Sequence, residues 1–595
     1  MKKLTIYYDK ECPVCSHYIS YVSLKETYSS VKLINVRENQ SLFNKFKLQG
    51  FDLDKGMIAD VDGKIYYGAE AISLIAQSNT KPGLLSAINN TLFSKLEISK
   101  TLYPVLVSLR NLLLIILGKG KIASSFKPDC KRESFNNFHL FSWLWSFSTL
   151  FHFTYLAFHK GTYQHGPITL SWIYLALAIW IILNPTSKKV MAVFLTMISI
   201  QTIEMWQQMP TISSHAILLL FLMVTLLLTG FYTLLKRGYD TKSYYNSFAP
   251  SGRWILVIMY IFGIFHKINT DFLNPASSCA SALWASLPFP NLITQSTTLH
   301  YLAIYSTFII EGLVLIALFS KNYRRYAILL GCFFHLFIML SPFAYYGAFS
   351  FLSLTLHSLF LGKESLENLK NSKLAGLISR NTHQIQTSML LYILVTVAIA
   401  FNKDITPLTF MAALLSLFVF GCIILYGQRQ YLEPNHPLKA NAFTYAVALT
   451  FFINCAMPYA GLKTHQAMSM FSNLHLEGNR SNHLLIDASA QKFDYLKETV
   501  RITRIQKNDK LLNIPKFDIV YHDLLAHMKD EPERYYSYIK DDKFYKDISY
   551  SKIKTEVNKT VLPAFIRKIF FFTGVDYNQP KSCVGFSENV KTIKN

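Results

Sequence analysis

Apolar runs of helical length recur from about residue 136 to residue 460, and they constrain this chain more than any other feature. An α-helix needs about 20 apolar residues to cross a bilayer. In the whole chain 51% of the residues are hydrophobic. We therefore expect a polytopic membrane protein with about 9 to 11 helices. The predicted spans are 136–158, 167–184, 190–209, 212–235, 253–268, 299–319, 325–346, 348–361, 387–402, 406–427 and 441–460.

The formal net charge of +23 does not indicate a nucleic-acid partner. There is no basic stripe with interleaved aromatic residues, and many Lys and Arg residues lie in short loops between apolar runs. Cytoplasmic loops of membrane proteins are rich in these residues, whereas one face of the predicted topology carries little beyond Lys160 and Lys403. We predict a bacterial cytoplasmic membrane protein with the N-terminus inside and the tail outside; one misassigned hairpin would move the tail.

Three regions follow from this pattern: residues 1–130, the membrane region 131–460, and a soluble, mixed α/β outer region 461–595. The N-terminal stretch MKKLTIYYDKECPVCS lacks the unbroken apolar core of a secretory signal peptide. LTIYYD and VKLINV are predicted strands, GMIADVDGKIYYG is a hairpin that turns at Asp62-Gly63, and CSHYISYVSLKE and AEAISLIAQ are helices. This order predicts an α/β, thioredoxin-like domain.

The sequence DKECPVC places Cys12 and Cys15 in a C-x-x-C motif where the first strand meets the first helix. The N–H groups and dipole of a helix N-terminus stabilise a thiolate there, which favours redox chemistry. A structural zinc site needs a second ligand pair, and none follows at a suitable spacing, so no metal is predicted. The alternative is a vestigial dithiol.

YDKECPVCSHY together with DGKIYYGAEAI resembles the DCC family of thiol-disulfide oxidoreductases, whose signature matches Asp9, Cys12 and Cys15. No proline precedes IADVDG, where a thioredoxin carries its cis-proline, so substrate handling is expected to differ. The resemblance implies a redox enzyme served by a cellular thiol reductant. Downstream, LYPVLVSLRNLLLIILGKGK carries Arg110 at its centre and is predicted to be a helix on the inner membrane surface.

The predicted helix from Arg253 ends in His266-Lys267, an ionisable pair near the outer membrane boundary. In one interpretation Lys267 extends to the interface and His266 is an interfacial residue. In the other, the amine is desolvated, which lowers its pKa and allows it to accept a proton near neutral pH. The residues by themselves leave both open.

IFGIFHKINTDFLNPASSCA resembles the motif of the HTTM family, whose membrane domain is related to the vitamin K-dependent gamma-carboxylases. The resemblance implies that Lys267 is the base that deprotonates a vitamin K hydroquinone. His266 stands where the carboxylases have another lysine, and Asp271 matches their acidic position.

Further segments extend this resemblance in the same order. MPTISSHAILLLFL aligns His215 with a family histidine, with Ser214 in place of an asparagine, and LGCFFHLFIMLSPFAYYGAF makes His335 a second candidate. MSMFSNLHLEGNRSNHLLI adds His483, for which a structural role is the alternative. Asn482 is the other most polar member of this segment. Glu204 and Glu311, at membrane depth, are candidate polar partners.

The resemblance implies a lyase-type carboxylation that uses a reduced, vitamin K-like quinone, oxygen and carbon dioxide. Its substrate would be a secreted peptide or protein that enters from outside, and the C-x-x-C domain would supply reducing equivalents. Because Ser214 and the apolar residues after His335 depart from the carboxylase pattern, carboxylation itself can be lost while quinone or lipid chemistry remains. The alternatives are a non-carboxylating membrane thiol-disulfide oxidoreductase and a membrane scaffold for peptide-toxin maturation.

The remaining cysteines fall into two sets. Cys279, Cys455 and Cys583 lie outside in the predicted topology, where an oxidising compartment permits a disulfide. Cys332 and Cys422 lie in apolar runs and are predicted to be buried thiols.

Overall fold

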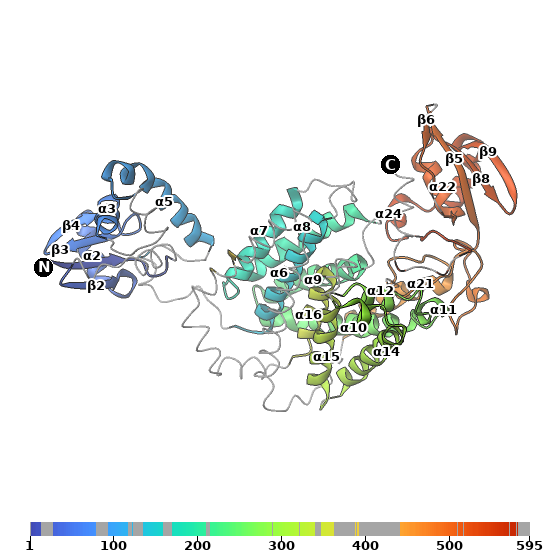
Figure 1. The fold of residues 1–595 in the computed structure, drawn as a ribbon, viewed down its shortest axis with the longest axis horizontal. Coiled ribbons are helices and arrows are strands. Elements are labelled where there is room, and N and C mark those ends of the chain that lie inside the picture. The colour runs from blue at the N-terminus through green and yellow to red at the C-terminus, as the bar shows by residue number, and fades with distance from the viewer. Residues whose placement is uncertain are drawn as a thin grey trace. The chain divides into compact units, whose positions relative to one another are not determined.

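The structure is a computed structural model, and its chain divides into two compact units (Figure 1). One contains residues 1–135, 179–190 and 373–394, and the other contains residues 136–178, 191–372 and 395–595. The residues described are 2–12, 28–78, 93–116, 122, 135–158, 169–209, 215–287, 289–320, 322–339, 347–361, 387, 390–391, 441–469, 471–508, 510–515, 517–570, 572–578, 580 and 583.

The first unit is built on a four-stranded sheet in the order β2-β1-β3-β4. β1 (Lys3–Tyr8) pairs parallel with β2 (Ser30–Asn35) and antiparallel with β3 (Ile58–Val61), which forms a hairpin with β4 (Lys64–Tyr67). The hairpin turns at Asp62-Gly63, whose φ angles of 49° and 88° suit a tight turn. The predicted strands and hairpin are therefore confirmed.

Three described helices complete this unit: α2 (Gln40–Leu48), α3 (Ala69–Gln77) and α5 (Leu96–Ile116). The apolar residues of α3 face the sheet, and α3 also packs against α5. The predicted helix over residues 15–26 lies outside the described residues, as does Cys15.

Nine helices of the second unit or its boundary coincide with nine of the eleven predicted spans. They are α6 (Asn137–Phe158), α7 (Thr169–Leu183), α8 (Val190–Gln208), α9 (His215–Arg237), α10 (Thr241–Phe265), α14 (Thr297–Phe319), α15 (Arg324–Met339), α16 (Gly347–Ser358) and α21 (Ala442–Ala460). Among the described residues five of them, α8, α9, α10, α14 and α21, are long and apolar enough to cross a membrane. The other two predicted spans, 387–402 and 406–427, lie almost wholly outside the described residues.

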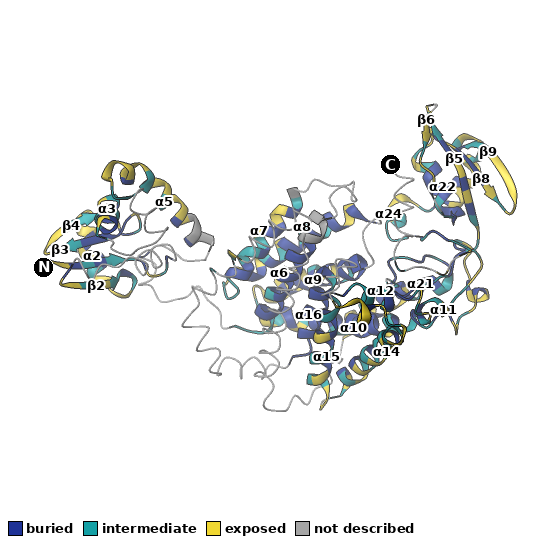
Figure 2. Cartoon of the chain, in the orientation of Figure 1, coloured by how far each residue is buried: buried dark blue, intermediate teal, exposed yellow. Residues whose placement is uncertain are grey.

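α10 occupies the centre of the bundle and packs against α6, α9, α14, α16 and α21. It begins 12 residues before the predicted start at Arg253, because the Asp240 side chain caps it by accepting the N–H groups of Lys242 and Ser243. In the most apolar stretch of α10 61% of the residues are buried, against 28% in α14, along which Figure 2 shows exposed residues. A residue at the end of α10 is therefore surrounded by other elements.

The C-terminal part of the second unit is an antiparallel sheet of β6 (Lys510–Leu512), β5 (Thr499–Lys507), β8 (Tyr535–Lys540) and β9 (Lys543–Ser549), with β7 (Ile519–Val520) beside β5. α22 (Tyr521–Asp530) and α23 (Lys554–Thr560) contribute to its apolar core. The mixed α/β character predicted for the tail is confirmed.

Candidate functional site

Lys267 follows the C-terminal end of α10 directly. The helix ends at Phe265, the Lys267 N–H still donates to the Ile264 carbonyl at 3.1 Å, and the chain then turns. Asn269 caps the short helix α11 (Thr270–Leu273) by accepting the Phe272 N–H at 2.8 Å. This sharp turn holds the Lys267 side chain beside α14.

Lys267 and Glu311 form a buried ion pair. The Lys267 Nζ atom lies 2.6 Å from both Oε1 and Oε2 of Glu311, and the two residues are only 9% and 7% exposed. The Phe272 ring centre lies 5.9 Å from the same amine. The amine thus turns inward to a carboxylate, and each charge offsets part of the desolvation cost of the other.

His266, the neighbour of Lys267, is hydrogen-bonded at both ring nitrogens. Its Nε2–H donates to the Ala467 carbonyl at 2.9 Å, so Nδ1 accepts the Tyr459 hydroxyl at 2.7 Å. His266 is therefore a neutral residue that fastens the end of α10 to α21 and to the segment after it. Its geometry fits a positioning role.

Asp271 and His483 lie where the loop after α10 meets the segment that follows α21. Thr270 N–H donates to the Asn482 carbonyl at 3.0 Å, and the Asn482 amide donates to Asp271 Oδ2 at 2.9 Å. His483 Nε2–H donates to the Phe265 carbonyl at 2.9 Å, while its Nδ1 accepts two backbone N–H groups. Burial lowers the pKa of His483, so it is neutral near pH 7.

A pocket of about 450 Å³ opens at this junction. Asp271, Asn482 and His483 line one part of it, and Asp576 and Tyr577 line another. The structure therefore brings two predicted site residues, Asp271 and His483, to one polar cavity.

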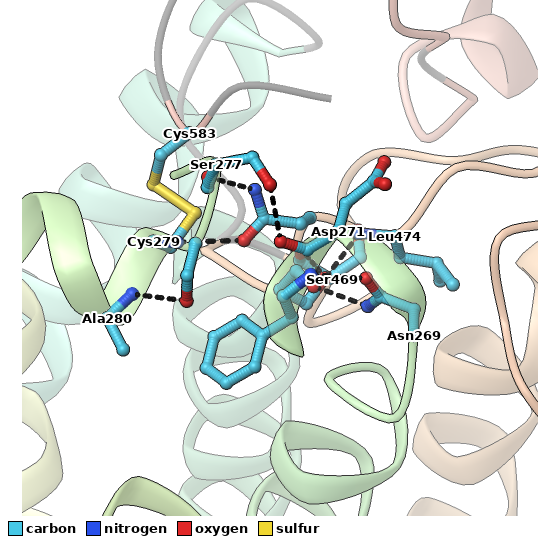
Figure 3. Close-up of a disulfide and its surroundings, with 12 residues drawn as sticks. Asn269, Asp271, Ser277, Cys279, Ala280, Ser469, Leu474 and Cys583 are labelled. Carbon is cyan, nitrogen blue, oxygen red and sulfur yellow. Dashed lines mark hydrogen bonds between the residues drawn. A yellow bond between two sulfur atoms is a disulfide. The ribbon is translucent and has the colours of Figure 1, made fainter. Parts of the chain in front are cut away.

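Cys279 and Cys583 form a disulfide beside this junction (Figure 3). Cys279 begins α12 (Cys279–Ala285), and its N–H donates to Asn473 Oδ1 at 2.9 Å. Ser277 donates to the Asp271 carbonyl at 2.7 Å and connects the disulfide region to the cavity. Of the three cysteines predicted to lie outside, Cys455 remains a buried thiol.

His335 lies in a polar network inside the bundle. Its Nε2 is 3.2 Å from the Tyr260 hydroxyl, which is also 3.1 Å from His357 Nε2. His215 packs against the other side of this region through Phe349, whose ring centre is 6.4 Å from that of His215 and 5.4 Å from that of His335. The two predicted histidines thus share one neighbourhood.

Glu204 lies on α8 and does not contribute to the Lys267–Glu311 pair. It accepts a hydrogen bond from Ser171, which joins α8 to α7, so of the two predicted polar partners Glu311 is the one that meets Lys267. Cys332 is a buried thiol, as predicted, and Cys422 lies outside the described residues.

Asp9 and Cys12 follow β1 in the first unit. Cys12 is fully buried, and its N–H donates to the Asp9 carbonyl at 3.2 Å. The Asp9 carboxylate accepts Arg37 Nε at 2.6 Å and Arg110 Nη2 at 2.8 Å. The two guanidinium groups therefore fix the carboxylate of Asp9 next to the turn that carries Cys12.

Arg110 lies in the helix that the sequence predicts on the inner membrane surface, and in the structure its side chain turns into the domain. It is 8% exposed and also donates to the Asp54 carbonyl. The long amphipathic helix places it on the inward side of α5, whereas Val105 and Leu109 are exposed.

Lys463 is a buried amine that sequence reasoning missed. It is 0% exposed, and Nζ donates to Asn454 Oδ1 at 2.7 Å and to the Ile569 carbonyl at 2.9 Å. Burial lowers its pKa to about 7. A lone Lys just after an apolar span was the available signal. Tyr260 and His357 were also missed, because each is a single polar residue in an apolar run and such a residue is a weak sequence signal.

Within the described ranges no group of His, Cys, Asp and Glu residues is arranged to hold a metal ion. Comparison with protein families finds a match to the DCC1-like thiol-disulfide oxidoreductase family over residues 6–115. Neither the curated proteins nor the solved structures contain a match. Residues 6–115 thus form a DCC1-like thiol-disulfide oxidoreductase domain, and the match includes Arg110 as well as the cysteine motif. The whole chain joins this domain to a bundle with membrane-span helices.

Proposed function

We propose that this protein is a membrane enzyme that modifies a secreted peptide or protein, with Lys267 and Glu311 as its acid–base pair. The DCC1-like domain would supply reducing equivalents from a cellular thiol. The observation that carries the proposal is the contact of Lys267 Nζ with both Glu311 oxygens at 2.6 Å inside the bundle. Ionisable groups at this depth are costly, and an apolar pair of similar volume would serve packing as well.

The pair can move a proton at a defined atom. A hydroxyl held against Glu311 gives its proton to the carboxylate, while the Lys267 ammonium keeps its charge and faces the oxygen that lost the proton. The charge of the pair changes from zero to +1, so the ammonium balances the new negative charge. The buried setting keeps bulk water from competing for the proton.

A reduced quinone is the cofactor that these residues fit. Lys267 and Glu311 provide a donor and an acceptor for a hydroxyl, and Phe272 lies beside the amine. α14, which carries Glu311, exposes apolar side chains such as Leu302 and Ile309 along its length, a surface suited to a lipid-soluble ring. When bound, such a quinol supplies electrons; oxygen and carbon dioxide are the co-substrates implied by the family resemblance.

The cavity at Asp271 and His483 is the proposed place for the peptide. It is polar, it is formed partly by the outer domain, and it lies at the junction that follows Lys267. The proposal includes an outward-facing C-terminal domain and a cytoplasmic N-terminus, as the loop charges predict.

The second candidate function is a membrane-bound thiol-disulfide oxidoreductase in which the bundle only anchors the domain. The match of residues 6–115 to the DCC1-like thiol-disulfide oxidoreductase family favours it. A related alternative is a membrane scaffold for peptide-toxin maturation. In that case the bundle would hold other proteins and would catalyse no reaction.

The test is intact-mass analysis of secreted peptides from cells that express wild-type protein, Lys267→Met, Lys267→Arg or Cys12→Ser at equal levels. We expect a mass increment that Lys267→Met abolishes and that Lys267→Arg retains in part, because arginine keeps the positive charge that balances the deprotonated hydroxyl but not the geometry of the ammonium. An increment equal to one carbon dioxide would identify carboxylation. Lys492→Met, which changes an exposed lysine, is the control.

An increment that survives in Lys267→Met and disappears in Cys12→Ser would support the second candidate instead. If no secreted peptide changes between wild-type cells and cells without the protein, the proposed modification is wrong.

A further inference from the structure

Ser353 fixes the protonation pattern of His357. His357 Nδ1 lies 2.7 Å from the Ser353 carbonyl, which can only accept, so Nδ1 carries the proton. Its Nε2 atom is then a lone-pair acceptor, and the Tyr260 hydroxyl at 3.1 Å donates to it.

The Tyr260 hydroxyl in turn determines which nitrogen of His335 carries the proton. Because the Tyr260 proton is directed to His357, the Tyr260 oxygen accepts from His335 Nε2 at 3.2 Å. His335 therefore carries its proton on Nε2, and Nδ1 has a bare lone pair. This Nδ1 atom is buried and has no hydrogen-bond partner among the described residues. An unpartnered acceptor in a 3%-exposed residue indicates a site for a donor.

The network is connected to the proposed acid–base pair through α10. Tyr260 is on α10, the helix that ends at Lys267, while His335 and His357 come from α15 and α16. The three side chains are 2%, 3% and 0% exposed.

Gly331 on α15 leaves space for the His357 ring. A Cβ atom at Gly331 would lie 2.3 Å from His357 Nε2, so only glycine admits the imidazole at its bonding distance to Tyr260.

We propose that His335, Tyr260 and His357 form a proton relay that takes a proton at His335 Nδ1 from a bound hydroxyl compound. As Nδ1 gains that proton, the Nε2 proton passes to the Tyr260 oxygen and the Tyr260 proton passes to His357 Nε2. The hydroxyl loses one proton, and His357 becomes an imidazolium whose Nδ1–H remains on Ser353. The identification of the hydroxyl with the reduced quinone depends on the proposed function, whereas the direction of the hydrogen bonds does not.

The first test measures oxidation of menadiol by oxygen with the purified full-length protein in lipid nanodiscs. Tyr260→Phe removes the central hydroxyl and should lower kcat by about 10² while KM changes little. The matched control is Tyr244→Phe, since Tyr244 is a buried tyrosine on the same helix whose hydroxyl donates to the Leu226 carbonyl at 2.9 Å. In the control, kcat should remain within about threefold of wild type.

The dependence of the rate on the deuterium fraction of the solvent separates a relay from a structural network. A plot of rate against deuterium fraction should be curved for wild type and Tyr244→Phe, because several protons move together. It should be linear for Tyr260→Phe. Equal rates and equal curvature in Tyr260→Phe and wild type would overturn the relay.

The second test needs no activity. Solid-state ¹⁵N NMR of histidine-labelled protein, assigned with His335→Gln and His357→Gln, should find the proton on Nε2 of His335 and on Nδ1 of His357. A proton on His335 Nδ1 would overturn the proposal. If the wild-type protein fails to oxidise menadiol but these tautomers are observed, the proposed quinol function is wrong and the relay geometry stands.

Discussion

Arg110 and Asp9 are separated by 101 residues in the sequence and by 2.8 Å in the structure, between Nη2 and Oδ2. This contact joins the end of β1 to α5 and completes the cysteine-bearing domain. It also explains why a helix that resembles a surface helix belongs to the DCC1-like domain, whose family match ends at residue 115.

Replacing Arg110 with Met should destabilise the N-terminal domain by about 3 kcal/mol, because Asp9 would keep a buried charge with one partner fewer. Arg110→Lys should recover only part of this loss, since an ammonium lacks the fork that reaches both Asp9 and the Asp54 carbonyl. Hydrogen exchange of residues 2–12 in the full-length protein measures the effect. Val105→Ala, an exposed position on the same helix, should leave exchange unchanged.

The Lys267–Glu311 pair should separate stability from activity in a double-mutant cycle. Lys267→Met and Glu311→Leu should each lower the free energy of unfolding by about 3–5 kcal/mol, since each leaves one buried charge unpaired. The double variant should recover most of that stability and remain inactive. Additive losses of stability measured in mixed micelles would show that the pair is not coupled.

The Cys279–Cys583 disulfide tethers the C-terminal segment to α12. Cys583→Ser should lower stability by about 2–5 kcal/mol and expose the segment around residue 580 to protease. Alkylation followed by mass analysis should find one additional free thiol in this variant, at Cys279. Cys332→Ala should leave the sensitivity of the protein to reductant unchanged, because Cys332 is a buried thiol.

Lys463 should make stability depend on pH. Its folded-state pKa is about 7 against 10.5 for the free side chain, so between these values the unfolded chain binds a proton that the folded protein lacks. Stability should therefore rise with pH across this window, by up to about 1.4 kcal/mol per pH unit relative to Lys463→Met. A difference between the two proteins that is flat from pH 7 to pH 10 would mean that the buried amine stays charged.

Gly331→Ala should displace His357 from Tyr260, because the added Cβ would meet His357 Nε2 at 2.3 Å. We expect the tautomer of His335 to become mixed and menadiol oxidation to fall as in Tyr260→Phe. Gly312→Ala is the control, since a Cβ at this helical glycine meets nothing within 4 Å.

The sequence by itself determined the elements that depend on neighbouring residues. Apolar runs predicted the helices of the bundle, and alternation with an Asp-Gly turn predicted the β3–β4 hairpin, because periodicity and turn chemistry are local. The position of Lys267 at the end of a central helix could also be predicted.

Only the tertiary structure decided which distant groups meet. Glu311 lies 44 residues from Lys267, and Cys583 lies 304 residues from Cys279. His335 and His357 both contact the hydroxyl of Tyr260, which lies on a third helix. Sequence places several carboxylates, cysteines and histidines at similar depth, and none of their local surroundings distinguishes the true partner. The choice follows from how α10, α14, α15 and α16 pack, since a buried polar group is stable only where the packing brings its partner within hydrogen-bonding distance.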